Sequence, residues 1–96
     1  MDFNGVAAEQ AKEGRWTAVF DLIREEKVSN LDELAIYATE QGDLEILNLL
    51  VDRGANNFNT IAKKAIIYNH MDILKYVVNL TELNLNQLAL LAVTFN

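Results

Sequence analysis

An internal repeat limits what this chain can fold into. The segment Leu31–Asn57 is followed at once by a variant of itself, Phe58–Asn84, so the second copy begins 27 residues after the first. Related segments begin at Phe3 and Leu85, which gives successive spacings of 28, 27 and 27 residues. Periods of roughly 20–50 residues are typical of supersecondary units that stack on one another. We therefore predict one domain over residues 1–96, built of repeats at residues 3–30, 31–57, 58–84 and 85–96.

The start of each repeat has the apolar spacing of a helix that buries one face. Counted from the first residue of the repeat, the fourth, fifth, eighth and twelfth positions share one side of an α-helix. The fifth position is alanine in all four repeats, and so small a side chain lets neighbouring helices approach closely. The fourth position holds a larger apolar residue, which we expect in the core: Val6, Leu34, Ile61 and Leu88.

Polar residues at fixed positions mark where this helix begins and ends. The second position holds residues of the type that caps a helix N-terminus: Asn4, Asp32, Asn59 and Asn86. The twelfth position holds residues that tolerate the left-handed backbone at the end of a helix: Gly14, Gly42, Asn69 and Asn96. The sequence therefore predicts a tight turn after each first helix.

A second, more apolar helix follows in the first three repeats. Its apolar positions begin at Trp16, Leu44 and Met71, and the acids Glu45 and Asp72 lie in its first turn, where the helix dipole favours negative charge. The chain has no proline, so the helices can run without a break. We predict an all-α fold, a helix-turn-helix repeat solenoid of about three and a half repeats, because the fourth repeat has room for one helix.

The composition argues against catalysis and metal binding. There is no cysteine, which excludes disulfides, thiol nucleophiles and cysteine zinc sites. The one histidine, His70, stands just before a predicted second helix, where we expect it to bond backbone in the turn rather than a metal ion. The sequence contains no glycine-rich phosphate loop and no nucleophile elbow. We therefore expect no enzyme activity, no catalytic residues, no metal site and no cofactor.

The charge argues against nucleic acid as a direct partner. The net charge is −6, and residues 31–57 hold six acids against one base. An acidic chain repels the phosphates of DNA and RNA. No apolar run approaches the roughly 18 residues of a membrane span, and the opening residues carry no basic run of a secretory signal. We therefore expect an intracellular, cytoplasmic protein that does not bind membranes.

Two segments resemble the second half of an ankyrin repeat, whose usual form is G-H-x-E-[IV]-[VL]-x-x-L-L-x-x-G-A. They are GDLEILNLLVDRGAN at residues 42–56 and NHMDILKYVV at residues 69–78, where His70 stands at the position that often holds histidine in the family. The similarity covers residues 3–96 and is strongest in the second and third repeats. The T-P-L-H motif is absent, and the period of 27 residues is shorter than the usual period of about 33, so most of the projecting β-hairpin is missing. Such short repeats are similar to those of large DNA viruses, phages and some intracellular bacteria, which implies a viral protein in the cytoplasm of an infected host.

The ankyrin resemblance also implies where a partner binds. In that family the first helices line the concave surface that usually contacts partners. On these helices the third, sixth, seventh and tenth positions lie opposite the core face. We predict that partner-binding residues lie there: Glu33, Ile36, Tyr37, Glu40, Lys63, Lys64, Ile67, Leu90 and Leu91. Apolar side chains rimmed by charge favour recognition of another protein, so we expect a non-catalytic protein-protein interaction module with Tyr37 as its anchor.

Two other functions are compatible with the same residues. The acid-rich second repeat is also typical of a small viral or phage inhibitor that blocks a nucleic-acid-binding or defence protein by presenting carboxylates in place of phosphates. Self-association is the other, because the apolar residues of the last repeat could cover those of a second copy in a homodimer. A residual finger or a neighbouring helix could instead cover the apolar residues of this surface, which are Ile36, Tyr37, Ile67, Leu90 and Leu91. Leu90 and Leu91 could also pack on Phe95 or on a second copy of the chain.

Overall fold

The computed structural model describes residues 2–81, and every regular element in this range is an α-helix. The helices are α1 (Phe3–Lys12), α2 (Trp16–Arg24), α3 (Leu31–Gln41), α4 (Leu44–Asp52), α5 (Phe58–Ile67) and α6 (Met71–Leu80). The predicted all-α class is therefore confirmed for this part of the chain. The expectations for the fourth repeat, including those for Leu88, Leu90, Leu91 and Asn96, lie outside the described residues.

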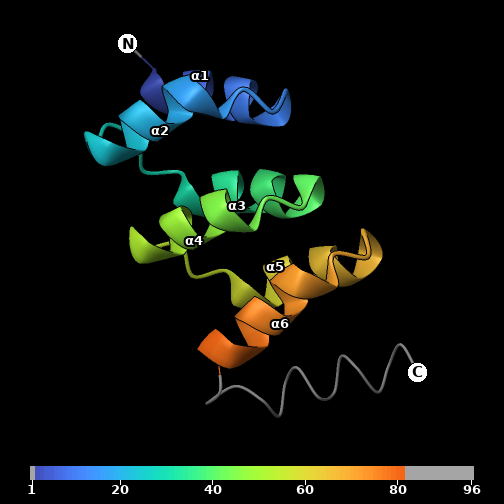
Figure 1. The fold of residues 1–96 in the computed structure, drawn as a ribbon. Coiled ribbons are helices and arrows are strands. Elements are labelled where there is room, and N and C mark those ends of the chain that lie inside the picture. Colours follow the sequence, from blue (N-terminus) through green and yellow to red (C-terminus); the bar gives the residue numbers. More distant parts are fainter. Residues whose placement is uncertain (1, 82–96) are drawn as a thin grey trace.

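The six helices form three antiparallel pairs that follow one another along the molecule (Figure 1). Each first helix packs on the second helix of its own pair, so α1 contacts α2, α3 contacts α4 and α5 contacts α6. Between pairs, the main contacts run through the first helices, because α3 packs against both α1 and α5. The first helices of all three pairs are therefore neighbours in space.

The turns inside the pairs have the left-handed backbone that the sequence predicts. The φ angles of Gly14, Gly42 and Asn69 are 76°, 75° and 60°. These three residues occupy the same position in successive repeats, and each is followed within two residues by the next helix. Glycine and asparagine adopt this conformation at low cost, so the prediction for these three turns is confirmed.

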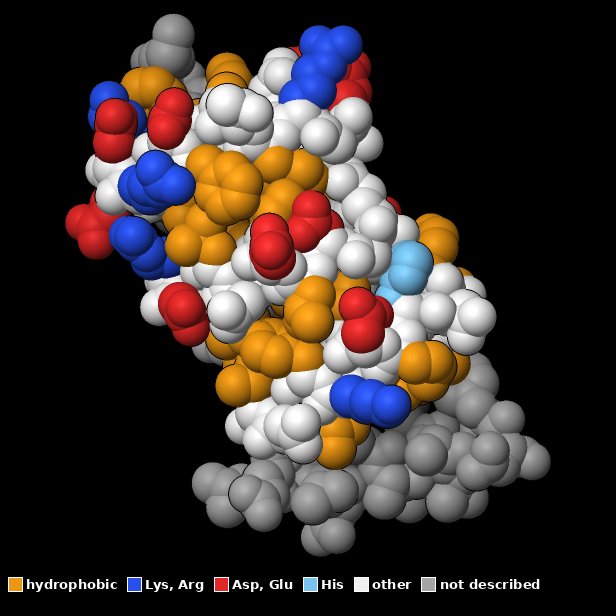
Figure 2. All heavy atoms as spheres, in the orientation of Figure 1, with side chains coloured by type: hydrophobic (Ala, Val, Ile, Leu, Met, Phe, Trp, Pro, Cys, Tyr) orange, Lys and Arg blue, Asp and Glu red, His pale blue; other side chains and the backbone are white. Residues whose placement is uncertain are grey.

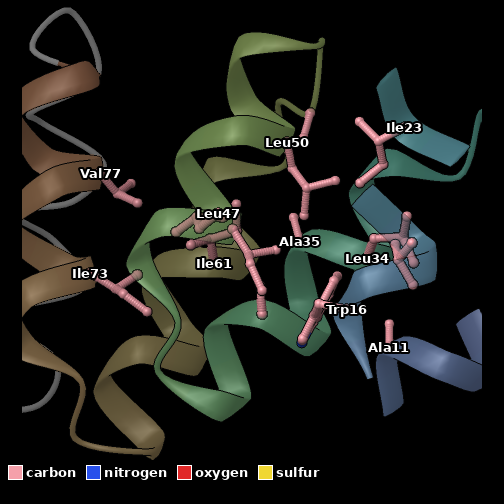
Figure 3. Close-up of a cluster of buried hydrophobic side chains, with 14 of the residues drawn as sticks. Ala11, Trp16, Ile23, Leu34, Ala35, Leu47, Leu50, Ile61, Ile73 and Val77 are labelled. Atoms are coloured by element: carbon pink, nitrogen blue, oxygen red, sulfur yellow. The ribbon is translucent and has the colours of Figure 1, made fainter. Parts of the chain in front are cut away.

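The core is a continuous cluster of apolar side chains that runs through all three pairs (Figure 3). The repeated alanines Ala7, Ala35 and Ala62 are fully buried between the helices, as expected of small residues at close helix contacts. Leu34 and Ile61, at the fourth position of their repeats, are also fully buried.

Val6, at the fourth position of the first repeat, does not follow this pattern. Its side chain is 41% exposed, so the prediction that it lies in the core is wrong. The reason is its place in the array. Helix α1 packs mainly on α2 and α3, whereas α3 is held by α1, α4 and α5. The face that carries Leu34 in α3 thus has a neighbour that α1 lacks among the described helices.

The prediction that second-position residues cap the helices is also wrong. The residues that precede α1, α3 and α5 are Asp2, Asn30 and Asn57. Only Asp2 caps its helix through the side chain. The amide nitrogens of Asn30 and Asn57 instead donate to the backbone carbonyls of Asn4 and Asp32, at 3.1 Å and 3.0 Å. The start of each later pair is thereby bonded to the start of the pair before it.

The side chains of Asn4 and Asp32 complete this connection. Oδ1 of Asn4 accepts the backbone N–H of Ser29 at 2.9 Å, and Oδ1 of Asp32 accepts that of Asn56 at 2.9 Å. Both acceptors lie within the first turn of a first helix, and both donors lie in the loop that leads to the next pair. The second position therefore fixes the connecting loop, and it does so in the same way in two successive repeats.

Candidate functional site

The first-helix ribbon is the surface that the sequence predicts to bind a partner. We define it as the third, sixth, seventh and tenth positions of α1, α3 and α5: Gly5, Ala8, Glu9, Lys12, Glu33, Ile36, Tyr37, Glu40, Thr60, Lys63, Lys64 and Ile67. None of these residues is buried. Because α3 packs against both α1 and α5, the ribbon joins side chains from three repeats on adjacent helices. Leu90 and Leu91 lie outside the described residues.

Tyr37, in the middle of the ribbon, is held by both of its neighbours. Its hydroxyl donates a hydrogen bond of 3.2 Å to Oε2 of Glu33, one turn earlier on α3. The ammonium of Lys12, on α1, lies 5.7 Å from the centre of the tyrosine ring. The ring is half-buried and packs against the core. Tyr37 therefore has a fixed ring position and presents part of its surface to solvent.

An ion pair connects α3 to α5 across the ribbon. Nζ of Lys64 lies 3.1 Å from Oε2 of Glu40, and both side chains are about two-thirds buried, with 34% and 28% of their surfaces exposed. The same ammonium lies 5.9 Å from the ring centre of Tyr68. Of the two ribbon lysines, Lys64 thus holds two helices together, whereas Lys63 is exposed.

His70 contacts the backbone of Glu40, the acidic partner in this ion pair. Its Nε2 lies 3.2 Å from the backbone carbonyl oxygen of Glu40, as the sequence predicts for a histidine that bonds backbone. The imidazole also lies against Gly42, where an added Cβ would stand 2.7 Å from the ring carbon Cε1. Glycine at residue 42 therefore serves the left-handed turn and makes room for the histidine of the following pair. Nowhere in residues 2–81 do three His, Cys, Asp or Glu side chains gather as a metal site.

Three of the five large apolar residues that are exposed in the described part of the chain lie at one end of the ribbon, and the other two are Val6 and Leu80. Ile67, Tyr68 and Met71, around the turn between α5 and α6, are 65%, 46% and 45% exposed. The sequence predicts Ile67 as part of the site but misses the other two. The exposure of Tyr68 could have been predicted from the sequence, because the equivalent residues of the first two repeats, Glu13 and Gln41, are polar. Met71 stands at the apolar position that Trp16 occupies in α2, but it is exposed whereas Trp16 is buried.

The second helices carry a different polar contact. The hydroxyl of Tyr76, on α6, donates a 2.8 Å hydrogen bond to Oδ1 of Asn48, on α4. Partial burial, with the nearby carboxylate of Asp52 as a smaller cause, raises the pKa of Tyr76 above its usual 10.0.

Figure 2 shows one face of the molecule, where apolar side chains gather along the middle and are interrupted by acidic ones.

Known proteins give no further guide to this site. No protein-family model, curated protein or solved structure matches the chain. None of the helices in residues 2–81 is long and apolar enough to cross a membrane.

Proposed function

We propose that this chain is a non-catalytic, ankyrin-like repeat protein that binds another protein through the first-helix ribbon. The observation that carries the proposal is the packing of α3 against both α1 and α5. This packing brings corresponding positions of three repeats onto neighbouring helices, as in a helical solenoid. Such a surface extends over several repeats, and its outward positions can vary without disturbing the packing between them.

The chemistry of the ribbon supports a protein as the partner. Ile67 is 65% exposed, and Tyr68 lies next to it, while Glu40, Lys63 and Lys64 place charges of both signs close by. Apolar and aromatic side chains surrounded by charged ones are typical of protein-protein interfaces. Because Ile67 is the most exposed of these apolar residues, it replaces Tyr37 as the anchor that we propose.

Tyr37 retains a supporting role in the proposed interface. Glu33 and Lys12 already hold its ring in place, so binding would order it at little further entropic cost. Its exposed edge lies among charged residues, which favours a partner that offers an apolar group beside hydrogen-bonding groups. This role requires the ring as it stands, so Tyr37 is a poorer first choice for mutation than Ile67.

Quantitative affinity capture from the native cell, compared between three forms of the chain, tests the proposed face. We expect a protein that the wild type captures to be lost with Ile67→Glu, because a charge is placed in the apolar end of the ribbon. The matched control is Thr17→Glu, an exposed position on α2, which should capture that protein as well as the wild type does. If both variants retain every captured protein, the ribbon is not the binding face.

The salt dependence of the same complex separates the proposal from an acidic inhibitor. Carboxylates that replace phosphates would give binding that falls steeply as salt rises, because such contacts are screened. Binding anchored by Ile67 should weaken little. The ion pair between Glu40 and Lys64 favours the interaction module, because it neutralises an acid on the ribbon and interrupts the acidic surface.

A further inference from the structure

Three apolar positions of the second helices change their exposure along the chain. They are the fourteenth, seventeenth and twenty-first residues of each repeat. In α2 all three are buried: Trp16, Val19 and Ile23, with 7%, 0% and 2% of their surfaces exposed. In α4 one is buried and two are half-buried: Leu47, then Leu44 and Val51. In α6 none is buried: Met71, Leu74 and Val78.

Two other positions show the opposite trend. At the sixteenth and twentieth positions, Ala18 is exposed and Leu22 half-buried in α2, whereas Ile73 and Val77 are fully buried in α6. The sixteenth and twentieth positions therefore face the preceding pair, and the fourteenth, seventeenth and twenty-first face the following pair. The hydrogen bond from Trp16 to Gln41 supports this, because it joins a fourteenth position to the end of the next first helix, α3.

The face of α6 that would meet a following pair forms an open groove. It has a volume of about 430 Å³ and is lined by Met71, Leu74, Lys75, Val78 and Asn79. The three apolar residues of the groove stand at the positions that are buried in α2. Leaving an apolar face of this kind in water is unfavourable. A helix with the pattern of α3 or α5 would cover this face, as α3 and α5 cover the pairs before them.

We propose that residues 85–96 of this chain dock in the groove on α6. The helices α3 and α5 each face the pair before them with a large apolar residue, an alanine directly after it and a second alanine three residues further on. These residues are fully buried: Leu34, Ala35 and Ala38 in α3, and Ile61, Ala62 and Ala65 in α5. The same spacing recurs in the sequence at Leu88, Ala89 and Ala92. Phe95 is the equivalent in the fourth repeat of Gln41, and Met71 is the equivalent in α6 of Trp16. Because Gln41 bonds Trp16, Phe95 would lie beside Met71.

The connecting sequence fits the same register. The hydrogen bond from Asn30 to Asn4 spans 26 residues, and the one from Asn57 to Asp32 spans 25. Asn84 follows Asn59 by 25 residues and precedes the docking segment, as Asn57 precedes α5. A segment held in this way is tethered a few residues from the groove, so it has a large advantage over a second chain at micromolar concentration.

Cross-linking in the full chain tests this docking, because the chain has no cysteine of its own. In Met71→Cys/Phe95→Cys, a short bis-maleimide should give a product of monomeric mass that carries one linker. Adding Leu88→Asp should lower the initial rate of that reaction at least roughly tenfold, because a carboxylate would be buried in the groove. Adding Gln87→Asp, a position that faces outward in the register, should leave the rate unchanged.

Two outcomes would overturn the proposal. Equal rates with Leu88→Asp and Gln87→Asp would mean that the segment is tethered but not docked. A product of dimeric mass in place of the monomeric one would mean that a second copy fills the groove. Far-UV circular dichroism checks that the helices persist, and if Leu88→Asp loses them, Leu88→Ala and Gln87→Ala give the same comparison with a milder change.

Discussion

The indole N–H of Trp16 donates a 2.8 Å hydrogen bond to Oε1 of Gln41, which lies 25 residues later at the end of α3. The amide nitrogen of Gln41 in turn donates to the backbone carbonyl of Ala11 at 2.6 Å. This carbonyl is in the last turn of α1 and also accepts the backbone N–H of Gly14 at 3.0 Å. One side chain from the second pair thus bonds two polar groups of the first pair, both next to the core.

Gln41→Leu should therefore destabilise the fold more than replacement of another exposed residue that makes no such hydrogen bonds. The substitution leaves the indole N–H without its acceptor and removes one donor to the Ala11 carbonyl, which costs about 1–3 kcal/mol. Denaturation by urea, followed by circular dichroism, measures the change. In a double-mutant cycle with Trp16→Phe, we expect a coupling of about 1 kcal/mol. Additive effects would show that the hydrogen bond contributes nothing.

Two isoleucines on one helix provide a test of the core. Ile61 is fully buried and Ile67 is 65% exposed, both on α5. Ile61→Ala removes buried carbons and leaves a cavity, so we expect a loss of about 2–5 kcal/mol. Ile67→Ala should change the free energy of unfolding by no more than about 0.5 kcal/mol. Similar losses for the two would mean that α5 does not pack in the register described.

The sequence could predict the helices and turns because these depend on local periodicity. The apolar spacing gives the helix positions, and the left-handed turns follow from Gly14, Gly42 and Asn69, which recur once in each repeat. The role of Asn4 and Asp32 could not be predicted in this way. An acceptor near a helix start suits a cap, and only the structure shows that the neighbouring loop supplies the donor instead.

The sequence predicts the site less completely, because the exposure of a side chain depends on which pairs are neighbours. Ile67 follows from its position on the first helix, and it is the most exposed large apolar residue that the structure describes. Val6 and Met71 occupy positions that are apolar in every repeat long enough to contain them, yet both are exposed at the ends of the three pairs. A pattern shared by all repeats does not distinguish an end from a middle.

The loop before α3 offers a route to higher stability. Glu26 has a φ of 58°, and the equivalent residue of the second repeat is Gly54, with a φ of 126°. A left-handed backbone is unfavourable for a residue with a Cβ, so Glu26→Gly should stabilise the fold by about 0.5–1 kcal/mol. At Asn69, where φ is 60°, replacement by alanine should cost about 1 kcal/mol. A thermal melt of each variant shows whether the melting temperature rises, as we expect for Glu26→Gly, or falls, as we expect for Asn69→Ala.

The contact between Asp32 and the loop can be tested with a replacement that the chain already uses. Asp32→Ala loses the acceptor for the backbone N–H of Asn56 and should cost about 1–2 kcal/mol. Asp32→Asn keeps an oxygen at the same place, as Asn4 does in the first repeat, and should restore most of the loss. Urea denaturation of the two variants measures the difference. If asparagine is no better than alanine, the hydrogen bond to the loop does not account for the stabilisation.

The raised pKa of Tyr76 predicts how stability changes in alkali. Burial, and to a smaller extent Asp52, disfavours the phenolate in the folded state, so the folded chain keeps its proton to a higher pH than the unfolded chain does. The contribution of the protonated Tyr76 to the free energy of unfolding is fully present below the usual pKa of 10.0. It is lost as the pH rises from there through the pKa of Tyr76 in the folded chain.

Titration of the phenolate absorbance, in a chain that keeps Tyr76 but carries Tyr37→Phe and Tyr68→Phe, should give a midpoint above 10.0. Asp52→Asn should lower that midpoint only in part, because burial is the larger cause and remains. Tyr76→Phe in the wild type should remove this part of the alkaline loss of stability, although it also removes the hydrogen bond to Asn48. A midpoint at or below the usual value would mean that the Tyr76 ring is more exposed in solution than its contact between α4 and α6 implies.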